Sequence, residues 1–102
     1  MDRKNTREDR IWRAQVIRRD SRCVICGSME SRNAHHLNSY SYFPNERYDV
    51  NNGVTLCGGG ANGCHSIFHN SYKNSYREKC TLKDFVNFKE LLSRIKNKTI
   101  IV

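Results

Sequence analysis

Apolar residues recur at helical spacing in the first part of the chain. Trp12 and Val16 stand four residues apart, so both fall on one face of a helix. Thr6 and Asp9 precede them as the pair that typically caps a helix N-terminus. We therefore predict a helix over about residues 7–18, with its arginines mostly off the apolar face.

A second amphipathic segment lies near the C-terminus. Thr81 and Asp84 form another capping pair, and apolar residues follow at helical spacing. A helix is therefore predicted over about residues 82–96. Its apolar stripe consists of Leu82, Phe85, Val86, Phe88, Leu92 and Ile95.

Between these helices the chain changes to short extended segments. Residues 33–37 and 54–56 have the character of strands, and the loop between them, 38–51, is rich in Asn, Ser and Tyr. Residues 64–72 contain no helix breaker and are predicted to be helical. This order of strand, loop, strand and helix, with a further helix on each side, predicts a small α+β fold.

The length of the chain predicts one domain, residues 1–102, with a core region of residues 23–72. Only 37% of the 102 residues are hydrophobic, which leaves a thin core that a bound metal would supplement. No apolar run is long enough to span a membrane, and the N-terminus lacks a secretory signal. We therefore expect a cytoplasmic protein, in which paired cysteines are more often metal ligands than disulfides.

The positive charge is concentrated toward the two ends of the chain, and the formal net charge is +8. Residues 1–22 carry eight basic and four acidic side chains, and residues 70–102 carry eight and three. The segment between them, 23–69, carries two basic and three acidic side chains. A nearly neutral centre between basic flanks suits a polyanionic partner such as nucleic acid. The alternative is a solvated basic surface that aids solubility.

Four cysteines in the central segment have the spacing of metal ligands. Cys23 and Cys26 are separated by two residues and followed by Gly27, which suits the positive φ of a metal-binding turn. Cys57 and Cys64 form a second pair, separated by six residues rather than the common two. The residues between them are mostly glycine and allow closure, so we predict a four-thiolate structural zinc site.

Two alternatives for these residues stay open. The cysteines can be buried small hydrophobic residues that hold no metal. A classical zinc finger can use Cys23, Cys26, His65 and His69, although the 38 residues between Cys26 and His65 exceed the usual ~12–15. Cys80, the fifth cysteine, is predicted to lie outside any site.

All four histidines lie in the central segment and form a second candidate site. His35 and His36 are adjacent in the predicted strand, so their side chains point to opposite faces. His65 and His69 are four residues apart and share one helix face, a spacing that grips a metal. Cys64 can turn toward the thiolate site while His65 turns toward this second site. A packing role is the alternative for His69.

Several runs of sequence together resemble the HNH endonucleases, in the zinc-containing branch common in bacteriophages and mobile elements. The resemblance covers about residues 10–92, and its motifs are specific in combination. The runs are 12–20 (WRAQVIRRD), followed by the Cys-x-x-Cys-Gly turn, 34–37 (AHHL), 43–49 (FPNERYD), 52–57 (NGVTLC) and 64–69 (CHSIFH).

The resemblance implies a ββα-metal (His-Me finger) motif around one divalent cation. His35 matches the first metal ligand and His36 the general base, and Asn52 matches the asparagine that pins the loop between the strands. His65 matches the ligand on the helix, and His69 matches a further ligand found in some members. The residues that match the structural zinc site are Cys23, Cys26, Cys57 and Cys64.

The activity that the resemblance implies is metal-dependent hydrolysis of DNA phosphodiester bonds, by nicking or double-strand cleavage, with 5′-phosphate and 3′-hydroxyl ends. Neutral His36 would activate water, and a cation held by His35 and His65 would stabilise the leaving oxygen. The expected cofactors are a structural Zn²⁺ and a catalytic Mg²⁺ or Mn²⁺. Zn²⁺ or Ni²⁺ can also occupy an imidazole site.

The expected partners are DNA and, through the resemblance, phage packaging (terminase) proteins in a phage-infected or prophage-bearing host. We expect a monomer or weak dimer without membrane association. The basic residues predicted to contact the DNA backbone are Arg10, Arg13, Arg47 and Lys73.

Two other functions stay open: a non-catalytic zinc-supported DNA-binding module, and a redox or regulatory zinc protein. No thiol stands apart with an obvious activating neighbour, which disfavours the redox protein. The adjacent pair His35–His36 with Asn52 downstream favours the nuclease, because a binding module needs none of these residues.

Overall fold

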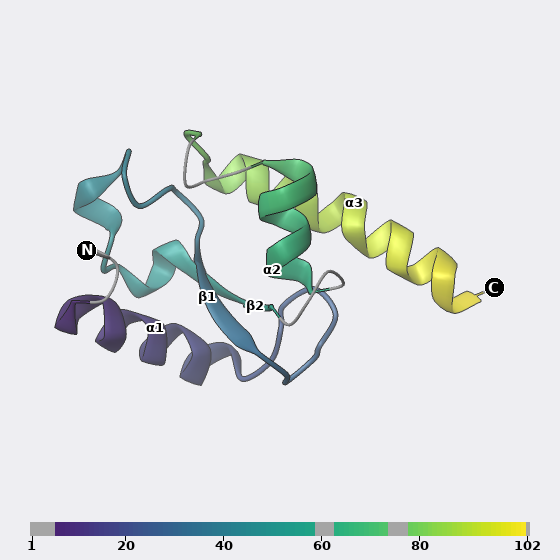
Figure 1. Ribbon diagram of the computed structural model, residues 1–102, viewed down its shortest axis with the longest axis horizontal. Coiled ribbons are helices and arrows are strands. Elements are labelled where there is room, and N and C mark those ends of the chain that lie inside the picture. Colours follow the sequence, from purple (N-terminus) through teal and green to yellow (C-terminus); the bar gives the residue numbers. More distant parts are fainter. Residues whose placement is uncertain (1–5, 59–62, 74–77, 102) are drawn as a thin grey trace.

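The chain folds as a small α+β unit, as predicted, with a two-stranded sheet between helices (Figure 1). The computed structural model describes residues 6–58, 63–73 and 78–101. In chain order the main elements are α1 (Arg7–Asp20), β1 (Arg32–His36), β2 (Gly53–Cys57), α2 (Cys64–Ile67), the π-helical segment η4 (Phe68–Tyr72) and α3 (Leu82–Ile101).

Helix α1 begins at the predicted capping pair. The backbone N–H of Asp9 donates to Thr6 Oγ1 at 3.2 Å, and the N–H of Thr6 donates to the Asp9 carboxylate at 3.1 Å. The helix ends where Ser21 takes a φ of +64°. Trp12 and Val16 are buried, so the predicted apolar face of α1 is confirmed.

The antiparallel sheet separates two packing layers. On one side, Thr55 Oγ1 donates to a carbonyl of α1 at 3.3 Å, and Gly53, which pairs with His36, packs closely against α1. On the other side, Leu56 is fully buried in a core shared with α2, η4 and α3. Because successive strand residues alternate between faces, His35 and His36 lie in different layers.

A long connection joins the two strands and contains two short 3-10 helices. These are η2 (Pro44–Glu46) and η3 (Val50–Asn52), both within or at the end of the predicted loop 38–51. The N-terminus of η3 is capped by Asp49, whose carboxylate accepts from the N–H of Asn51 at 2.9 Å. The connection is therefore an ordered part of the fold.

The segment predicted as one helix over 64–72 is divided between two helical forms. Only Cys64–Ile67 is α-helical, and η4 continues it as a π-helix, in which the N–H of Lys73 donates to the carbonyl of Phe68 at 2.8 Å. So short a segment has too few turns for its periodicity to distinguish the two forms.

Among the described side chains of α3, the buried ones lie on one side of the helix. Of the predicted apolar stripe, Phe85, Phe88 and Leu92 are buried, whereas Leu82 and Val86 are 50% and 52% exposed. The apolar stripe is therefore only partly covered, because Leu82 and Val86 lie beside the face that meets α2 and η4. The side chain of the sixth predicted residue, at position 95, lies outside the described residues.

The C-terminal part of α3 extends beyond the other elements (Figure 1), and the longest dimension of the molecule is 44 Å. The helix ends at Ile101 rather than near residue 96 as predicted. Among the described residues, none of the helices combines the length and the apolar character needed to cross a bilayer.

Candidate metal centres

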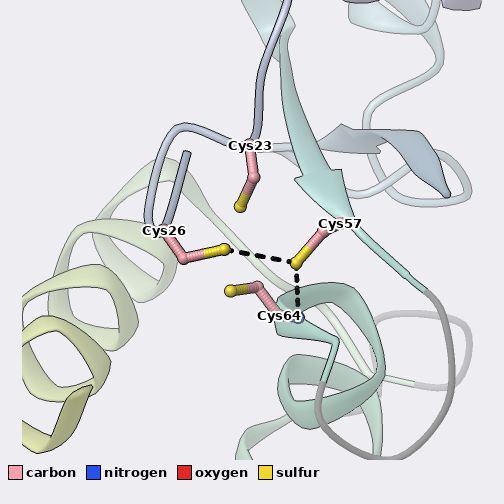
Figure 2. A group of neighbouring side chains, drawn as sticks. All are labelled: Cys23, Cys26, Cys57 and Cys64. Carbon is pink, nitrogen blue, oxygen red and sulfur yellow. Dashed lines mark hydrogen bonds between the residues drawn. The ribbon is translucent and has the colours of Figure 1, made fainter. Parts of the chain in front are cut away.

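Four cysteine side chains from three parts of the chain converge on one point (Figure 2). Cys23 and Cys26 come from the turn after α1, Cys57 ends β2, and Cys64 begins α2. Their Sγ atoms all lie within 4.8 Å of one another, and those of Cys26 and Cys57 are 3.4 Å apart. We call these four residues the thiolate cage.

Local backbone geometry aims the sulfur atoms at this point. The N–H of Gly27 donates to the carbonyl of Cys23 at 2.9 Å, and Gly27 takes the predicted positive φ, +78°. Across the cage, the N–H of Cys64 donates to Cys57 Sγ at 3.3 Å. Such N–H donors favour the thiolate form of a metal-binding cysteine.

The dimensions of the thiolate cage fit zinc. A tetrahedron with Zn–S bonds of about 2.3 Å has S···S edges of about 3.8 Å; the four sulfur atoms here lie within 4.8 Å of one another, with one pair at 3.4 Å. An all-sulfur donor set also suits a soft or borderline ion. Cys26 is exposed while the other three are buried. The four cysteines predicted as a set are therefore together and can hold a zinc ion.

The electrostatics of the thiolate cage also favour a cation. The thiol of Cys64 donates toward Cys23 and lowers the pKa of Cys23 to about 4. The same hydrogen bond, followed by burial, raises the pKa of Cys64, and burial raises the pKa of Cys57. Without a central positive charge the four thiols cannot all ionise, so a bound cation is what would make them equivalent ligands.

Three imidazole rings form a second group, which we call the imidazole cluster. His35 lies on β1, His65 on α2 and His69 on η4, and one ligand nitrogen of each lies within 4.8 Å of the others. The Nε2 atoms of His65 and His69 are 2.9 Å apart. The rings thus offer three nitrogen ligands to one point, as in metal sites that keep a fourth position open.

The surroundings of the imidazole cluster are apolar on one side and polar on the other. The His35 ring is 2% exposed and lies 4.6 Å from the ring of Phe68 and 5.9 Å from that of Phe85. His69 also lines a cavity of about 350 Å³ that opens to solvent. The other residues lining that cavity are Asn70, Ser71, Tyr72, Lys73 and Glu78.

The two groups share one short helix. Cys64 faces the thiolate cage and His65, the next residue, faces the imidazole cluster, as the sequence predicted. A metal in the thiolate cage would therefore tie α2 to β2 and, through α2, orient His65.

Asn52 spans the connection between the strands. Its Oδ1 accepts from the N–H of Asn38 at 2.8 Å, and its Nδ2 donates to the carbonyls of Asn38 and Glu46 at 3.0 and 3.1 Å. The side chain is 5% exposed. Asn52 thus closes the loop by hydrogen bonds to both of its halves.

The structure places His36 apart from the imidazole cluster, on the α1 side of the sheet. Its ring stacks on Trp12 with centroids 3.8 Å apart and meets the Tyr40 ring edge-on at 5.4 Å. Its Nε2 lies 3.0 Å from the carbonyl oxygen of Arg47. Because a carbonyl only accepts, Nε2 carries the proton, and in the neutral ring Nδ1 bears the lone pair.

The four basic residues predicted to contact DNA come from separate elements. Arg47 donates from Nε to the carbonyl of Tyr40 at 2.8 Å and lies over the Tyr40 ring, and Lys73 pairs with Asp84 at 3.3 Å. Arg10 and Arg13 lie on α1, where Arg10 is exposed and Arg13 is half-buried. DNA contact by these residues stays a prediction.

Two contributors to the surroundings of His36 were not predicted from the sequence. Trp12 was predicted only as a buried residue of the first helix, and no local spacing relates position 12 to position 36. The acceptor at Arg47 is a backbone carbonyl, which every residue carries, so no side-chain signal marks it.

Cys80 lies outside the thiolate cage and the imidazole cluster, as predicted. It is buried, and burial raises its pKa to about 11.

Comparison with known proteins leaves the family of the chain open. No family model, curated protein or solved structure matches it. A function for this chain therefore has to follow from the thiolate cage, the imidazole cluster and the residues around them.

Proposed function

We propose that this chain is a metal-dependent DNA endonuclease of the HNH type. The observation that carries the proposal is the imidazole cluster, with three nitrogen ligands converging from β1, α2 and η4 beside a polar cavity. Two further features support it: a histidine directly follows the β1 ligand, and Asn52 pins the loop between the strands.

The donor set of the imidazole cluster favours a transition metal. Mg²⁺ and Mn²⁺ prefer oxygen ligands, whereas imidazole suits Zn²⁺ and Ni²⁺ better. His35, His65 and His69 would hold the ion, which when bound would bind the scissile phosphate and stabilise charge on the leaving O3′. We therefore expect Ni²⁺ or Zn²⁺ to support cleavage at lower concentration than Mg²⁺ or Mn²⁺.

His36 has the hydrogen bonding that a general base needs. With Nε2 donating to the Arg47 carbonyl, Nδ1 is the nitrogen that takes a proton. It would remove that proton from a water molecule, which attacks phosphorus in line with the P–O3′ bond. The products would be a 5′-phosphate and a 3′-hydroxyl. Uncatalysed phosphodiester hydrolysis is so slow that roughly 20 kcal/mol must come off the barrier, which requires both the base and the cation.

The thiolate cage has a structural role in this proposal. It holds the start of α2 against the end of β2 and so sets the position of His65.

The net charge of +8 suits DNA, with Arg10, Arg13, Arg47 and Lys73 as candidate phosphate contacts. One such site cuts one strand, so a monomer would nick, and double-strand cleavage would need a dimer or two encounters. Phage packaging (terminase) proteins stay the candidate protein partners.

The test is cleavage of supercoiled plasmid by the zinc-loaded protein with added Mg²⁺, Mn²⁺, Ni²⁺ or Zn²⁺. The His36→Ala variant should cut about 10²- to 10⁴-fold more slowly, because the general base is lost. Asn33→Ala is the matched control, since Asn33 lies on the same strand and its side chain donates to the Ser31 carbonyl at 2.8 Å. Its cleavage rate should match that of the wild type.

Equal cleavage by His36→Ala and wild type would contradict the proposal. Metal-independent DNA binding without cleavage in any of the four ions would favour the non-catalytic zinc-supported DNA-binding module instead. Analysis of the product ends distinguishes a 5′-phosphate from a 3′-phosphate and so tests the direction of attack.

A further inference from the structure

We infer that Trp12 is a positioning residue for His36, an inference that rests on the proposed function for the catalytic role of His36. The indole sets the plane of the imidazole directly, and helps to set its tautomer through the connection that carries the Arg47 carbonyl. It does so from a helix that contributes no metal ligand. Helix α1 would then be a part of the active site, in addition to packing against the sheet.

Three contacts define the orientation of the His36 ring. The ring lies flat on Trp12, with an interplanar angle of 11° and centroids 3.8 Å apart. The carbonyl of Arg47, 3.0 Å from Nε2, sets the rotation within that plane. The Tyr40 ring meets the imidazole edge-on, with ring centroids 5.4 Å apart and an interplanar angle of 78°. A histidine has only two side-chain torsions, so these contacts leave it one orientation.

Trp12 is itself held in place. It is 1% exposed, and its Nε1–H donates to the carbonyl of Asp49 at 2.8 Å. Beneath it lies Gly53, where an added Cβ would come within 2.6 Å of the indole and of Val16. A larger residue at position 53 would displace the indole, so the close approach of β2 to α1 requires glycine there.

The same stretch of the inter-strand connection holds both rings. The carbonyl of Asp49 accepts from the indole and that of Arg47 accepts from the imidazole. Asn52 in turn donates to the carbonyl of Glu46, next to Arg47. Moving the indole would therefore shift the acceptor that selects the His36 tautomer as well as the surface on which the ring lies.

The experiment compares three variants. Trp12→Leu keeps an apolar side chain but removes the flat surface, and Trp12→Phe keeps a flat surface without the bond to Asp49. Val16→Ala is the control, because Val16 is buried on the same face of α1 and its aliphatic side chain has no ring on which His36 could stack. Each variant is checked for zinc content and cooperative unfolding before its cleavage of a saturating plasmid substrate is measured.

We expect Trp12→Leu to lower the cleavage rate at saturating DNA by about 10- to 100-fold, in the range that misplacement of a catalytic group costs, with KM unchanged. Trp12→Phe should regain most of the rate, and Val16→Ala should stay within about threefold of wild type. A general packing defect would instead lower the rate in Val16→Ala as much as in Trp12→Leu, and that result would overturn the inference.

A second readout does not depend on cleavage. The ¹⁵N shifts of the His36 ring should show one tautomer, protonated at Nε2, in wild type and Trp12→Phe, and averaging between tautomers in Trp12→Leu. A single unchanged tautomer in Trp12→Leu would overturn the inference even if the protein proves to be a nuclease.

If the wild type never cuts DNA, the proposed function fails while this readout still decides the role of Trp12. If Trp12→Leu does not fold, averaging in Trp12→Phe overturns the inference and a single tautomer there supports it.

Discussion

Two neighbouring side chains on β1 have opposite surroundings. His35 is 2% exposed against the ring of Phe68, whereas His36 stacks on Trp12 on the other side of the sheet. The alternation of a strand produces this difference without any break in the backbone. In the proposed reaction, one ring would hold the cation and the other would accept a proton.

Asn52 gives the sharpest prediction for a single side chain. Asn52→Ala removes three hydrogen bonds and leaves backbone groups of Asn38 and Glu46 unsatisfied. We expect the free energy of unfolding to fall by about 2–3 kcal/mol, as measured by urea denaturation. The neighbouring Asn51 is exposed, so Asn51→Ala should change it by no more than about 0.5 kcal/mol. Equal losses in the two variants would show that Asn52 does not pin the loop.

The junction between η4 and α3 depends on one carboxylate. Asp84 accepts from the N–H of Thr81 at 2.9 Å, at the start of α3, and from Lys73 Nζ at 3.3 Å, just after η4. Burial alone would raise the pKa of Asp84, but these donors outweigh it and lower the pKa below the ordinary 3.8. The ionised carboxylate therefore stabilises the packing of α3 next to the imidazole cluster.

This lowered pKa predicts how stability depends on pH. A depressed folded-state pKa contributes stability that is present above the unfolded-state value and is lost as pH falls through the folded-state value. Asp84→Asn should lower the free energy of unfolding by about 0.5–1 kcal/mol at both pH 7 and pH 5, because both pH values lie above the unfolded-state pKa of the carboxyl. The loss of stability in Asp84→Asn should become smaller only below about pH 3.8, the ordinary pKa of this carboxyl.

Urea denaturation at the two pH values, with zinc content checked, measures this cost. Glu90→Gln is the control, because Glu90 is on the same helix in an exposed pair with Arg94. A cost of Asp84→Asn that is present at pH 7 but absent at pH 5 would contradict a lowered pKa.

The thiolate cage is part of the hydrophobic core as well as a candidate metal site. Cys23, Cys57 and Cys64 belong to the same buried cluster as Leu56 and Phe68. A chain of 102 residues with 37% hydrophobic content buries little apolar surface, so a bound ion would add substantially to its stability.

Metal removal should therefore affect the entire fold. We expect about one zinc per chain that resists mild EDTA, and a strong chelator should lower the free energy of unfolding by about 3 kcal/mol or more. Cys57→Ser should lose the zinc and the stability together, as measured by elemental analysis and thermal unfolding. Cys80→Ala, at a buried cysteine outside the cage, should keep the zinc. Stoichiometric zinc in Cys57→Ser would show that the cage is not the site.

The features that could be predicted from the sequence are those set by short-range interactions. The Thr6–Asp9 pair caps α1 because its hydrogen bonds join residues three apart, and alternation along a strand separates His35 from His36. The consecutive placement of Cys64 and His65 likewise directs them to different centres. The spacing of the four cysteines was enough to predict them as one ligand set.

Other features depended on contacts between distant parts of the chain. The exposure of Leu82 and Val86 could not be predicted, because an apolar stripe does not show how much of the helix its neighbours will cover. The stacking of Trp12 on His36 follows from the close approach of β2 to α1, which no spacing along the chain reveals. Local hydrogen bonding and short spacings thus made the elements and the ligand pairs predictable from the sequence. Packing between residues far apart in the sequence, by contrast, set the surroundings of the His35 and His36 rings.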